Sequence, residues 1–165
     1  MLSAEDLEHL RTAIAVSRAA SRRGDEPYGA TLVGERGEIL LSAGNTQVTD
    51  RDCTGHAETN LLRAATRQFD VETLTRCTVY ASGEPCPMCA GAIYWSNVRR
   101  VVFALGIARM RALAGPDADE LILSCRDVLA HGMHPVAVLG PALEDEAAAV
   151  LQEHYSGRTR RTGHG

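Results

Sequence analysis

Two short stretches of the sequence hold the residue types most suited to chemistry. The first is His56-Ala57-Glu58, and the second is Pro85-Cys86-Pro87-Met88-Cys89. Their imidazole and two thiols are typical zinc ligands, and three protein ligands leave a tetrahedral Zn²⁺ with one position open to water. Zinc lowers the pKa of a bound water towards neutrality. The stretches therefore predict a hydrolytic site with one Zn²⁺ per chain, bound by His56, Cys86 and Cys89, in which Glu58 carries protons.

The spacing of these residues predicts that two helices start at the metal. Pro87 suits the first position of a helix, so the thiols of Cys86 and Cys89 would project from a single first turn. The positive end of the helix dipole there favours thiolate over thiol. His56 opens a second helical segment, over 57–69. We therefore expect two helix N-termini to converge on one cation.

The cysteine pair also allows two other interpretations. A C-x-x-C pair alone also occurs in redox proteins and in structural zinc knuckles. The nearby His-x-Glu, and the lack of a second C-x-x-C that would close a four-ligand cage, favour the open metal site. We expect Cys53, Cys77 and Cys125 to be buried, because free cysteine is among the most buried residue types. An odd count of five cysteines argues against a disulfide framework and favours the cytoplasm.

The pattern H-x-E…P-C-x-x-C resembles that of the zinc-dependent cytidine/deoxycytidylate deaminase superfamily, in which the glutamate acts as acid and base. Pro27-Tyr28-Gly29-Ala30 is similar to the family's usual Pro-Phe-Gly-Ala, and Asn45 resembles its substrate-anchoring asparagine. The stretch 84–95 is similar to the bacterial guanine deaminases in particular. The resemblance covers roughly residues 5 to 155. Gly83, where cysteine is common, and Tyr28 in place of Phe depart from the pattern.

The resemblance implies roles for several residues. Asn45 would bind a purine edge, Tyr28 would stack on or bound the ring, and the N–H group of Ala57 at a helix start would contact the substrate. In the guanine deaminases the C-terminal segment can close the pocket, which implies a substrate contact for Tyr155 or His154. Asp117 and Glu120 lie where that branch supplies an acidic partner for the purine, although a surface acidic turn also explains them.

Composition limits the possible partners. The chain has 165 residues, 45% of them hydrophobic, which suits one domain with a sizeable core. No apolar run of about 18 residues or basic leader is present, so neither a membrane span nor a signal peptide is predicted. The net charge of −4 and the absence of an obvious basic face disfavour nucleic acid as a partner. A homodimer is implied only by the resemblance.

Periodicity and turn residues predict an α/β domain. Helices are expected over 3–22, 57–69, 86–95 and 124–130 and from Leu143 onward; strands are expected over 28–33, 38–43, 77–81, 100–104 and 135–140. Strand–helix–strand alternation implies parallel pairing with a right-handed crossover. The resulting prediction, shared by the resemblance, is a three-layer α/β/α cytidine-deaminase-like fold with a five-stranded mixed sheet. It comprises one domain over 1–156 and a disordered tail over 157–165. Tyr94 and Trp95 are expected to pack at a helix end.

These observations lead to one main functional hypothesis and three alternatives. The main hypothesis is zinc-dependent hydrolytic deamination of a free purine base or a related small heterocyclic amine, with guanine, giving xanthine and ammonia, as the leading substrate. Deamination of adenosine in tRNA and deamination of cytosine or a nucleoside use the same metal chemistry. A zinc-stabilised interaction domain without catalysis is the remaining alternative.

Overall fold

The computed structural model describes residues 1–115 and 121–162, with the backbone alone over 158–162. Asp117 and Glu120 therefore lie outside the described residues. The helices and strands, in chain order, are α1 (Ala4–Arg23), β1 (Gly29–Val33), β2 (Ile39–Gly44), α2 (Ala57–Gln68), α3 (Val71–Thr75), β3 (Thr78–Gly83), α4 (Pro87–Trp95), β4 (Arg100–Leu105), α5 (Ile107–Ala114), α6 (Cys125–Ala130), β5 (Ala137–Leu139) and α7 (Glu144–Thr162).

The five strands form one mixed sheet in the order β2-β1-β3-β4-β5. β1 pairs antiparallel with both β2 and β3, whereas β3 pairs parallel with β4, and β4 with β5. The predicted hairpin, the parallel pairing and the five-stranded mixed sheet are therefore confirmed. Because β3 and β4 are parallel and joined through α4, the N-terminus of α4 lies at the edge of the sheet where β3 ends.

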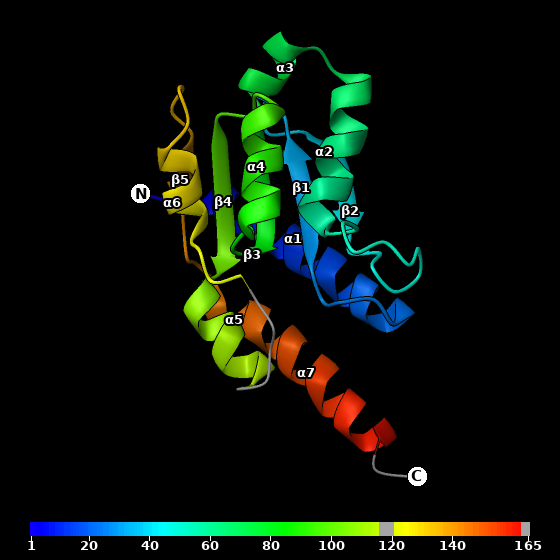
Figure 1. Ribbon diagram of the computed structural model, residues 1–165. Helices are drawn as coiled ribbons and strands as arrows, with labels where there is room; N and C mark the ends of the chain where they lie inside the picture. Colours follow the sequence, from blue (N-terminus) through cyan, green and yellow to red (C-terminus); the bar gives the residue numbers. More distant parts are fainter. Residues whose placement is uncertain (116–120, 163–165) are drawn as a thin grey trace.

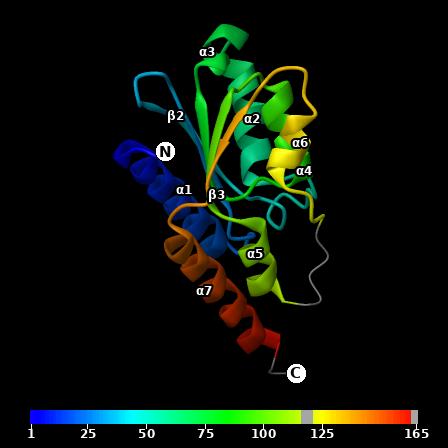
Figure 2. The same cartoon turned by 90° about the vertical axis from the view of Figure 1, so that its left-hand side faces the viewer.

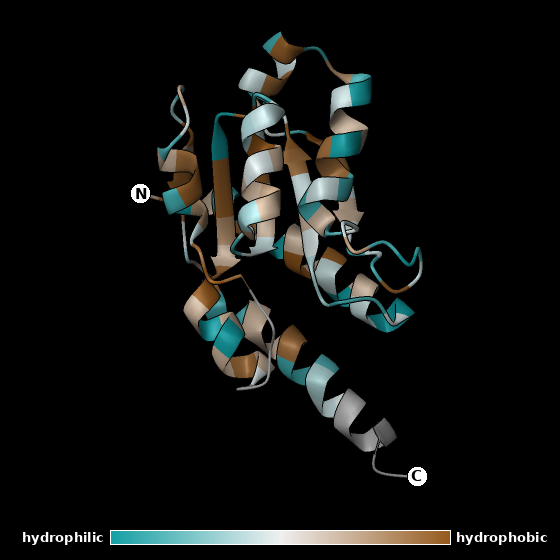
Figure 3. Cartoon of the chain, viewed as in Figure 1, coloured by the Kyte–Doolittle hydropathy of each residue, from teal (hydrophilic) through white to brown (hydrophobic). Residues whose placement is uncertain are grey.

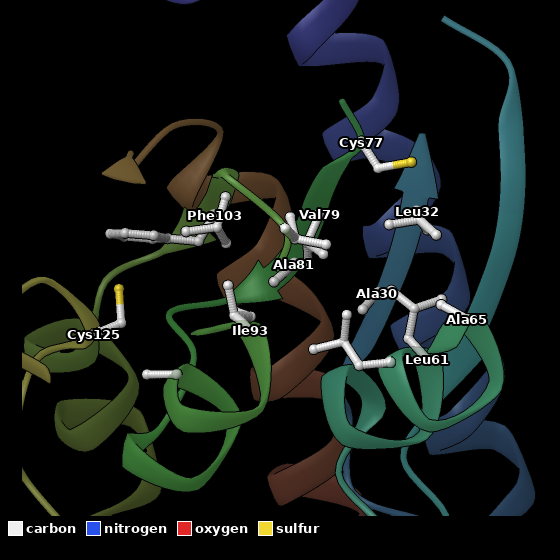
Figure 4. Close-up of a cluster of buried hydrophobic side chains, with 14 of the residues drawn as sticks. Ala30, Leu32, Leu61, Ala65, Cys77, Val79, Ala81, Ile93, Phe103 and Cys125 are labelled. Carbon is white, nitrogen blue, oxygen red and sulfur yellow. The ribbon is translucent and has the colours of Figure 1, made fainter. Parts of the chain in front are cut away.

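Helices cover both faces of this sheet and make three layers (Figure 1, Figure 2). On one face, α2, α4 and α6 enclose a core that includes Leu61, Ile93 and Cys125 (Figure 4). On the other face, α1 and α7 pack against the sheet through residues such as Leu10 and Leu151. Figure 3 shows β4, between the two layers, coloured mainly as hydrophobic. This pattern is the one expected for a strand buried on both faces.

Local signals explain why α1 begins and ends where it does. Ser3 accepts a hydrogen bond from the Asp6 N–H, and the Asp6 carboxylate accepts one from the Ser3 N–H, which forms a capping box. Gly24, with φ 95°, ends the helix in the left-handed conformation that glycine tolerates. The backbone of α1 then lies close to β1, because a Cβ built on Gly29 would be 2.4 Å from the Ser17 nitrogen. Glycine permits this close approach.

Several predictions differ from the structure. The helices α3 and α5, which are only five and eight residues long, were not predicted. The helix α7 continues to Thr162, whereas the sequence predicted a disordered tail from residue 157. Residues 163–165 lie outside the described residues, so the division into a domain and a tail stays a prediction.

Two predictions about single side chains are wrong. Cys53 is exposed, because it lies in the turn before α2 rather than under a helix, although Cys77 and Cys125 are buried as expected. Trp95 is 80% exposed at the end of α4 and does not pack into the core. Tyr94 behaves as predicted, since its ring stacks on His134 with centroids 4.0 Å apart.

Candidate active site

The predicted ligand residues meet at the N-termini of two helices. His56 is the N-cap of α2, Cys86 is the N-cap of α4, and Pro87 occupies the first turn of α4. His56 Nδ1 lies 3.4 Å from Cys86 Sγ and 3.6 Å from Cys89 Sγ. The three donor atoms lie within 4.8 Å of one another and could hold a metal ion.

The geometry of this group can be tested against zinc. Zn–N bonds of about 2.0 Å and Zn–S bonds of about 2.3 Å in a tetrahedron place nitrogen and sulfur ligands about 3.5 Å apart. The observed distances of 3.4 and 3.6 Å agree with this spacing. One imidazole and two thiols are also a ligand set that zinc accepts. The residues present therefore fit a zinc ion.

Glu58 lies beside this group, in the first turn of α2. Its side chain is buried, and Oε2 lies 3.4 Å from Cys89 Sγ. Burial raises the pKa of the Glu58 carboxyl above its ordinary value. Hydrogen bonds with Cys89 and His56 lower the pKa of the Cys86 thiol to about 4, against the opposing effect of its burial. The Glu58 carboxyl thus lies at the Cys89 sulfur, in the same cluster as a Cys86 thiol that ionises readily.

Buried polar side chains anchor the loop that leads from β2 to His56. Asp25 is fully buried, and its carboxylate accepts hydrogen bonds from the Val48 and Thr49 N–H groups at 3.2 and 2.9 Å. Asn60, on α2, donates to the carbonyl oxygens of Gly44 and Gly55, at the two ends of the loop. These contacts position the N-terminus of α2.

Asn45 is held in one orientation by Gln47. The Asn45 Nδ2 group donates to Gln47 Oε1 at 2.8 Å, and its Oδ1 accepts from the Gln47 N–H at 2.9 Å. Each end of the Asn45 amide retains capacity for one more partner, because the NH₂ group has a second hydrogen and the oxygen a second lone pair. Asn45 can therefore present one donor and one acceptor side by side.

A cavity of about 430 Å³ lies at the N-termini of α2 and α4. Figure 1 shows that α5 and α7 lie next to these helix starts. The predicted residues that line it are Tyr28, Asn45, His56, Glu58, Cys86 and Tyr155. Two predicted residues lie outside the cavity wall: Cys89 is buried behind Cys86, and the side chain of Ala57 is buried in the core. The cavity wall also contains residues that sequence reasoning missed, namely Glu26, Gln47, Glu84, Ile107, Met110 and Leu121.

The departure at Gly83 has a structural reason. A Cβ at this position would lie 2.7 Å from Met110 Sδ and 3.2 Å from Tyr28 Cε1. Both of those side chains line the cavity, and glycine at position 83 leaves the space that the larger Tyr28 ring occupies. Adjacent Glu84 is fully engaged, because its carboxylate accepts from the Ile107 N–H at 3.0 Å and the Cys125 N–H at 3.1 Å. It ties α5 and α6 to the end of β3.

Comparison with known proteins identifies the family. A family model described as the cytidine and deoxycytidylate deaminase zinc-binding region matches residues 3–105. The chain belongs to this family. A probable cytosine deaminase of Schizosaccharomyces pombe is 42% identical over 148 residues, which are 88% of this chain and 90% of that protein.

Solved structures give the same result. A guanine deaminase from Nitrosomonas europaea superposes with a TM-score of 0.76 at 25% identity, over 94% of this chain and 86% of that chain. A structure from a study of tRNA:A34 deaminases gives a TM-score of 0.69 at 27% identity, over 87% of this chain and 99% of that chain. The relatives named here are deaminases, that is, hydrolases of carbon–nitrogen bonds in cyclic amidines. They differ in substrate.

Among the described residues, no helix is both long and apolar enough to cross a membrane.

Proposed function

We propose that this protein deaminates a free aminated nucleobase, with guanine, giving xanthine and ammonia, as the leading substrate. The observation that carries the proposal is the buried Glu58 carboxyl beside the His56, Cys86 and Cys89 group, in the wall of a cavity. A general acid–base residue needs this combination of access to the substrate and a raised pKa.

His56, Cys86 and Cys89 would hold one zinc ion per chain. When bound, zinc supplies Lewis-acid activation of a water at neutral pH. The hydroxyl group of Thr59, 3.4 Å from Cys89 Sγ, supports the sulfur ligand from behind. Because His56 and Cys86 cap helices that begin at the cavity, the ligand atoms are placed by rigid backbone rather than by a loop.

Glu58 is the proton carrier of the reaction. It takes a proton from the attacking water, and the oxygen bonds to the ring carbon that bears the amine. Glu58 passes this proton to the ring nitrogen. It then takes the proton of the hydroxyl group on the same carbon and delivers it to the amine, which leaves as ammonia as the carbon–nitrogen bond breaks and the carbonyl forms. Water is consumed and ammonia is released, so Glu58 ends in the protonation state in which it began.

The remaining wall residues orient the substrate. Asn45, oriented by Gln47, pairs with a donor–acceptor edge of the ring. Tyr28 and Tyr155 bound the cavity with aromatic surface, which suits a flat heterocycle. The N–H group of Ala57, at the first position of α2, contributes a hydrogen bond near the reacting carbon.

Charge favours a neutral small molecule over a phosphate-bearing one. Glu26, Glu58 and Glu84 all line the cavity, and none of the lining residues that the structure describes is Lys or Arg. Carboxylates repel nucleotide and RNA phosphates. For this reason we rank the editing of tRNA adenosine below the free base. Cytosine is the second candidate, because the relative that is 42% identical is a probable cytosine deaminase.

The same proposal extends to assembly and location. The exposed side chains of Trp95 and Met133 support a homodimer, since large apolar residues at a surface often mark an interface. The five free cysteines support a reducing compartment, the cytoplasm.

A deamination screen tests the function. Zinc-loaded protein is incubated with guanine, adenine, cytosine, isocytosine, a pterin, an aminotriazine, the matching nucleosides and a tRNA stem-loop, and ammonia or inosine is measured. We expect the highest kcat/KM for guanine among these substrates. Faster turnover of cytosine would replace guanine by the second candidate, and inosine in the stem-loop as the main product would refute a free-base function.

A further inference from the structure

Among the described residues, three carboxylates line the cavity, and the contacts of two of them are given above. Glu58 lies at the Cys89 sulfur, and Glu84 accepts hydrogen bonds from the backbone of α5 and α6. The third, Glu26, belongs to the segment between α1 and β1 and was not singled out by its sequence context. It lines the same cavity as His56 and Cys86.

Glu26 is fastened to two parts of the chain. Its carbonyl oxygen accepts a hydrogen bond from the Tyr28 N–H at 2.8 Å, so the two wall residues move together. On its other side, Oε2 lies 3.9 Å from Nε2 of His154, a buried residue of α7. The His154 ring is itself held, because Nδ1 lies 2.9 Å from the Ser21 hydroxyl of α1. The Glu26 side chain remains 24% exposed, towards the cavity that it lines.

We infer that Glu26 is a specificity-determining residue whose carboxylate accepts a hydrogen bond from a ring N–H group of the substrate. This inference rests on the proposed function. An ionised carboxylate only accepts hydrogen bonds, so it favours the edge of a heterocycle that carries a donor. Free guanine and free cytosine have ring N–H groups, and methylation or glycosylation of the nitrogen removes the donor. The substrate class is therefore an amino-heterocycle that carries a free ring N–H.

The position of Glu26 also explains how α7 contributes to specificity. His154 Nε2 lies 3.9 Å from the carboxylate, while the next residue, Tyr155, lines the cavity itself. The two rings meet edge to face, with centroids 5.4 Å apart. One turn of α7 thus supplies the Tyr155 ring that lines the cavity and the His154 ring that lies next to the Glu26 carboxylate.

The test compares Glu26→Gln and Glu26→Ala with the unaltered protein on matched bases. The bases are guanine, 1-methylguanine and 9-methylguanine, with cytosine and 1-methylcytosine as a second set. A charge-assisted hydrogen bond is worth a factor of about 10 to 100, so we expect kcat/KM for the unmethylated base to fall by about that factor in both variants. In the unaltered protein, kcat/KM for either 1-methylguanine or 9-methylguanine should be lower than that for guanine by a similar factor. This difference should disappear in Glu26→Ala.

Glu153→Gln is the matched control. Glu153 precedes His154 in the chain, and its carboxylate pairs with Arg18 on the surface rather than lining the cavity. This variant should leave kcat/KM and the discrimination unchanged. Zinc content and melting temperature show that the Glu26 variants fold. Unchanged kcat/KM, or unchanged discrimination between methylated and unmethylated base, in folded Glu26 variants would refute the role of Glu26 while leaving the proposed function in place. No ammonia from any base with the unaltered protein would overturn the proposed function, and this inference with it.

Discussion

The carboxylate of Glu58 lies 3.4 Å from the sulfur of Cys89, and both side chains are buried. One residue comes from the first turn of α2 and the other from the first turn of α4, so two helix starts position the proposed proton carrier and a proposed metal ligand. The close packing of the two helix starts places the acid where a substrate in the cavity would react.

The first prediction concerns Glu58. Glu58→Ala should lower kcat by at least about 100-fold, because it removes the group that moves protons. Zinc content should stay at one ion per chain, since Glu58 is not among the three clustered ligand residues. Ammonia release and elemental analysis measure the two quantities on one sample. Unchanged ammonia release would remove Glu58 from its role, and loss of zinc would make it a ligand.

The second prediction concerns the thiols. Cys86→Ala and Cys89→Ala should each fail to retain stoichiometric zinc after dialysis, because two ligands do not complete a stable site. Cys53→Ala is the control, since Cys53 is exposed and lies outside the cluster. Elemental analysis of the three variants gives the comparison. Stoichiometric zinc in both Cys86→Ala and Cys89→Ala would refute the ligand assignment.

The third prediction concerns the contact between α1 and β1. Gly29→Ala should lower the free energy of unfolding by about 1–3 kcal/mol, because the added Cβ would lie 2.4 Å from the Ser17 nitrogen and 2.5 Å from the Ala13 oxygen. Gly157→Ala, in α7, has no atom within 4 Å of the new Cβ and should be neutral or stabilising. Urea unfolding of both variants provides the measurement. Equal stabilities would contradict the close approach.

The fourth prediction concerns acid. Burial alone would raise the pKa of Asp6, but hydrogen bonds from Arg100, Ser3 and Tyr80 outweigh it and hold the pKa well below its usual value of 3.8. A depressed pKa in the folded state gives stability that is present above pH ~4 and is lost as the pH falls. The difference in unfolding free energy between the unaltered protein and Asp6→Asn should therefore be constant above about pH 5 and shrink as the pH falls below about 4.

Glu8→Gln, an exposed change on the same helix, is the control for Asp6→Asn. Urea unfolding at several pH values measures both variants. A stability difference for Asp6→Asn that stays constant with pH would show that the Arg100 pairing does not depress the pKa of Asp6.

The fifth prediction concerns Gly83. Gly83→Ala should raise KM more than it lowers kcat, because the new Cβ would displace Met110 and Tyr28 in the cavity wall and leave the ligand residues untouched. Steady-state kinetics on the best substrate of the screen give the two constants. A fall in kcat alone would place the effect at the reacting groups instead.

The arrangement of the two thiols at a helix start, which the sequence predicted, depends on local rules. Pro87 at a helix start, with thiols three residues apart, determines how Cys86 and Cys89 project, and the order of β3, α4 and β4 follows from chain connectivity. Glu26 and Gln47 could not be found this way. They come to the cavity through packing between segments, and no spacing relates them to His56 or Cys86.

The missed helix α5 and the misjudged side chains have a similar explanation. The helix α5 has only eight residues, and Gly106 begins it without a side-chain cap, so neither its length nor its start marks it in the sequence. Cys53 and Trp95 were assigned from the average behaviour of their residue types, which does not register an exposed turn or helix end. Tyr155 was implied by family resemblance alone.

His56 and Cys86 are 30 residues apart in the chain, yet their donor atoms are 3.4 Å apart. A cation bound by both residues would act as a cross-link that closes this long loop. Its binding would favour the native state over the unfolded chain by mass action. Removal of the metal by a chelator would then lower conformational stability as well as activity. The first contact to open would be the one between α2 and α4.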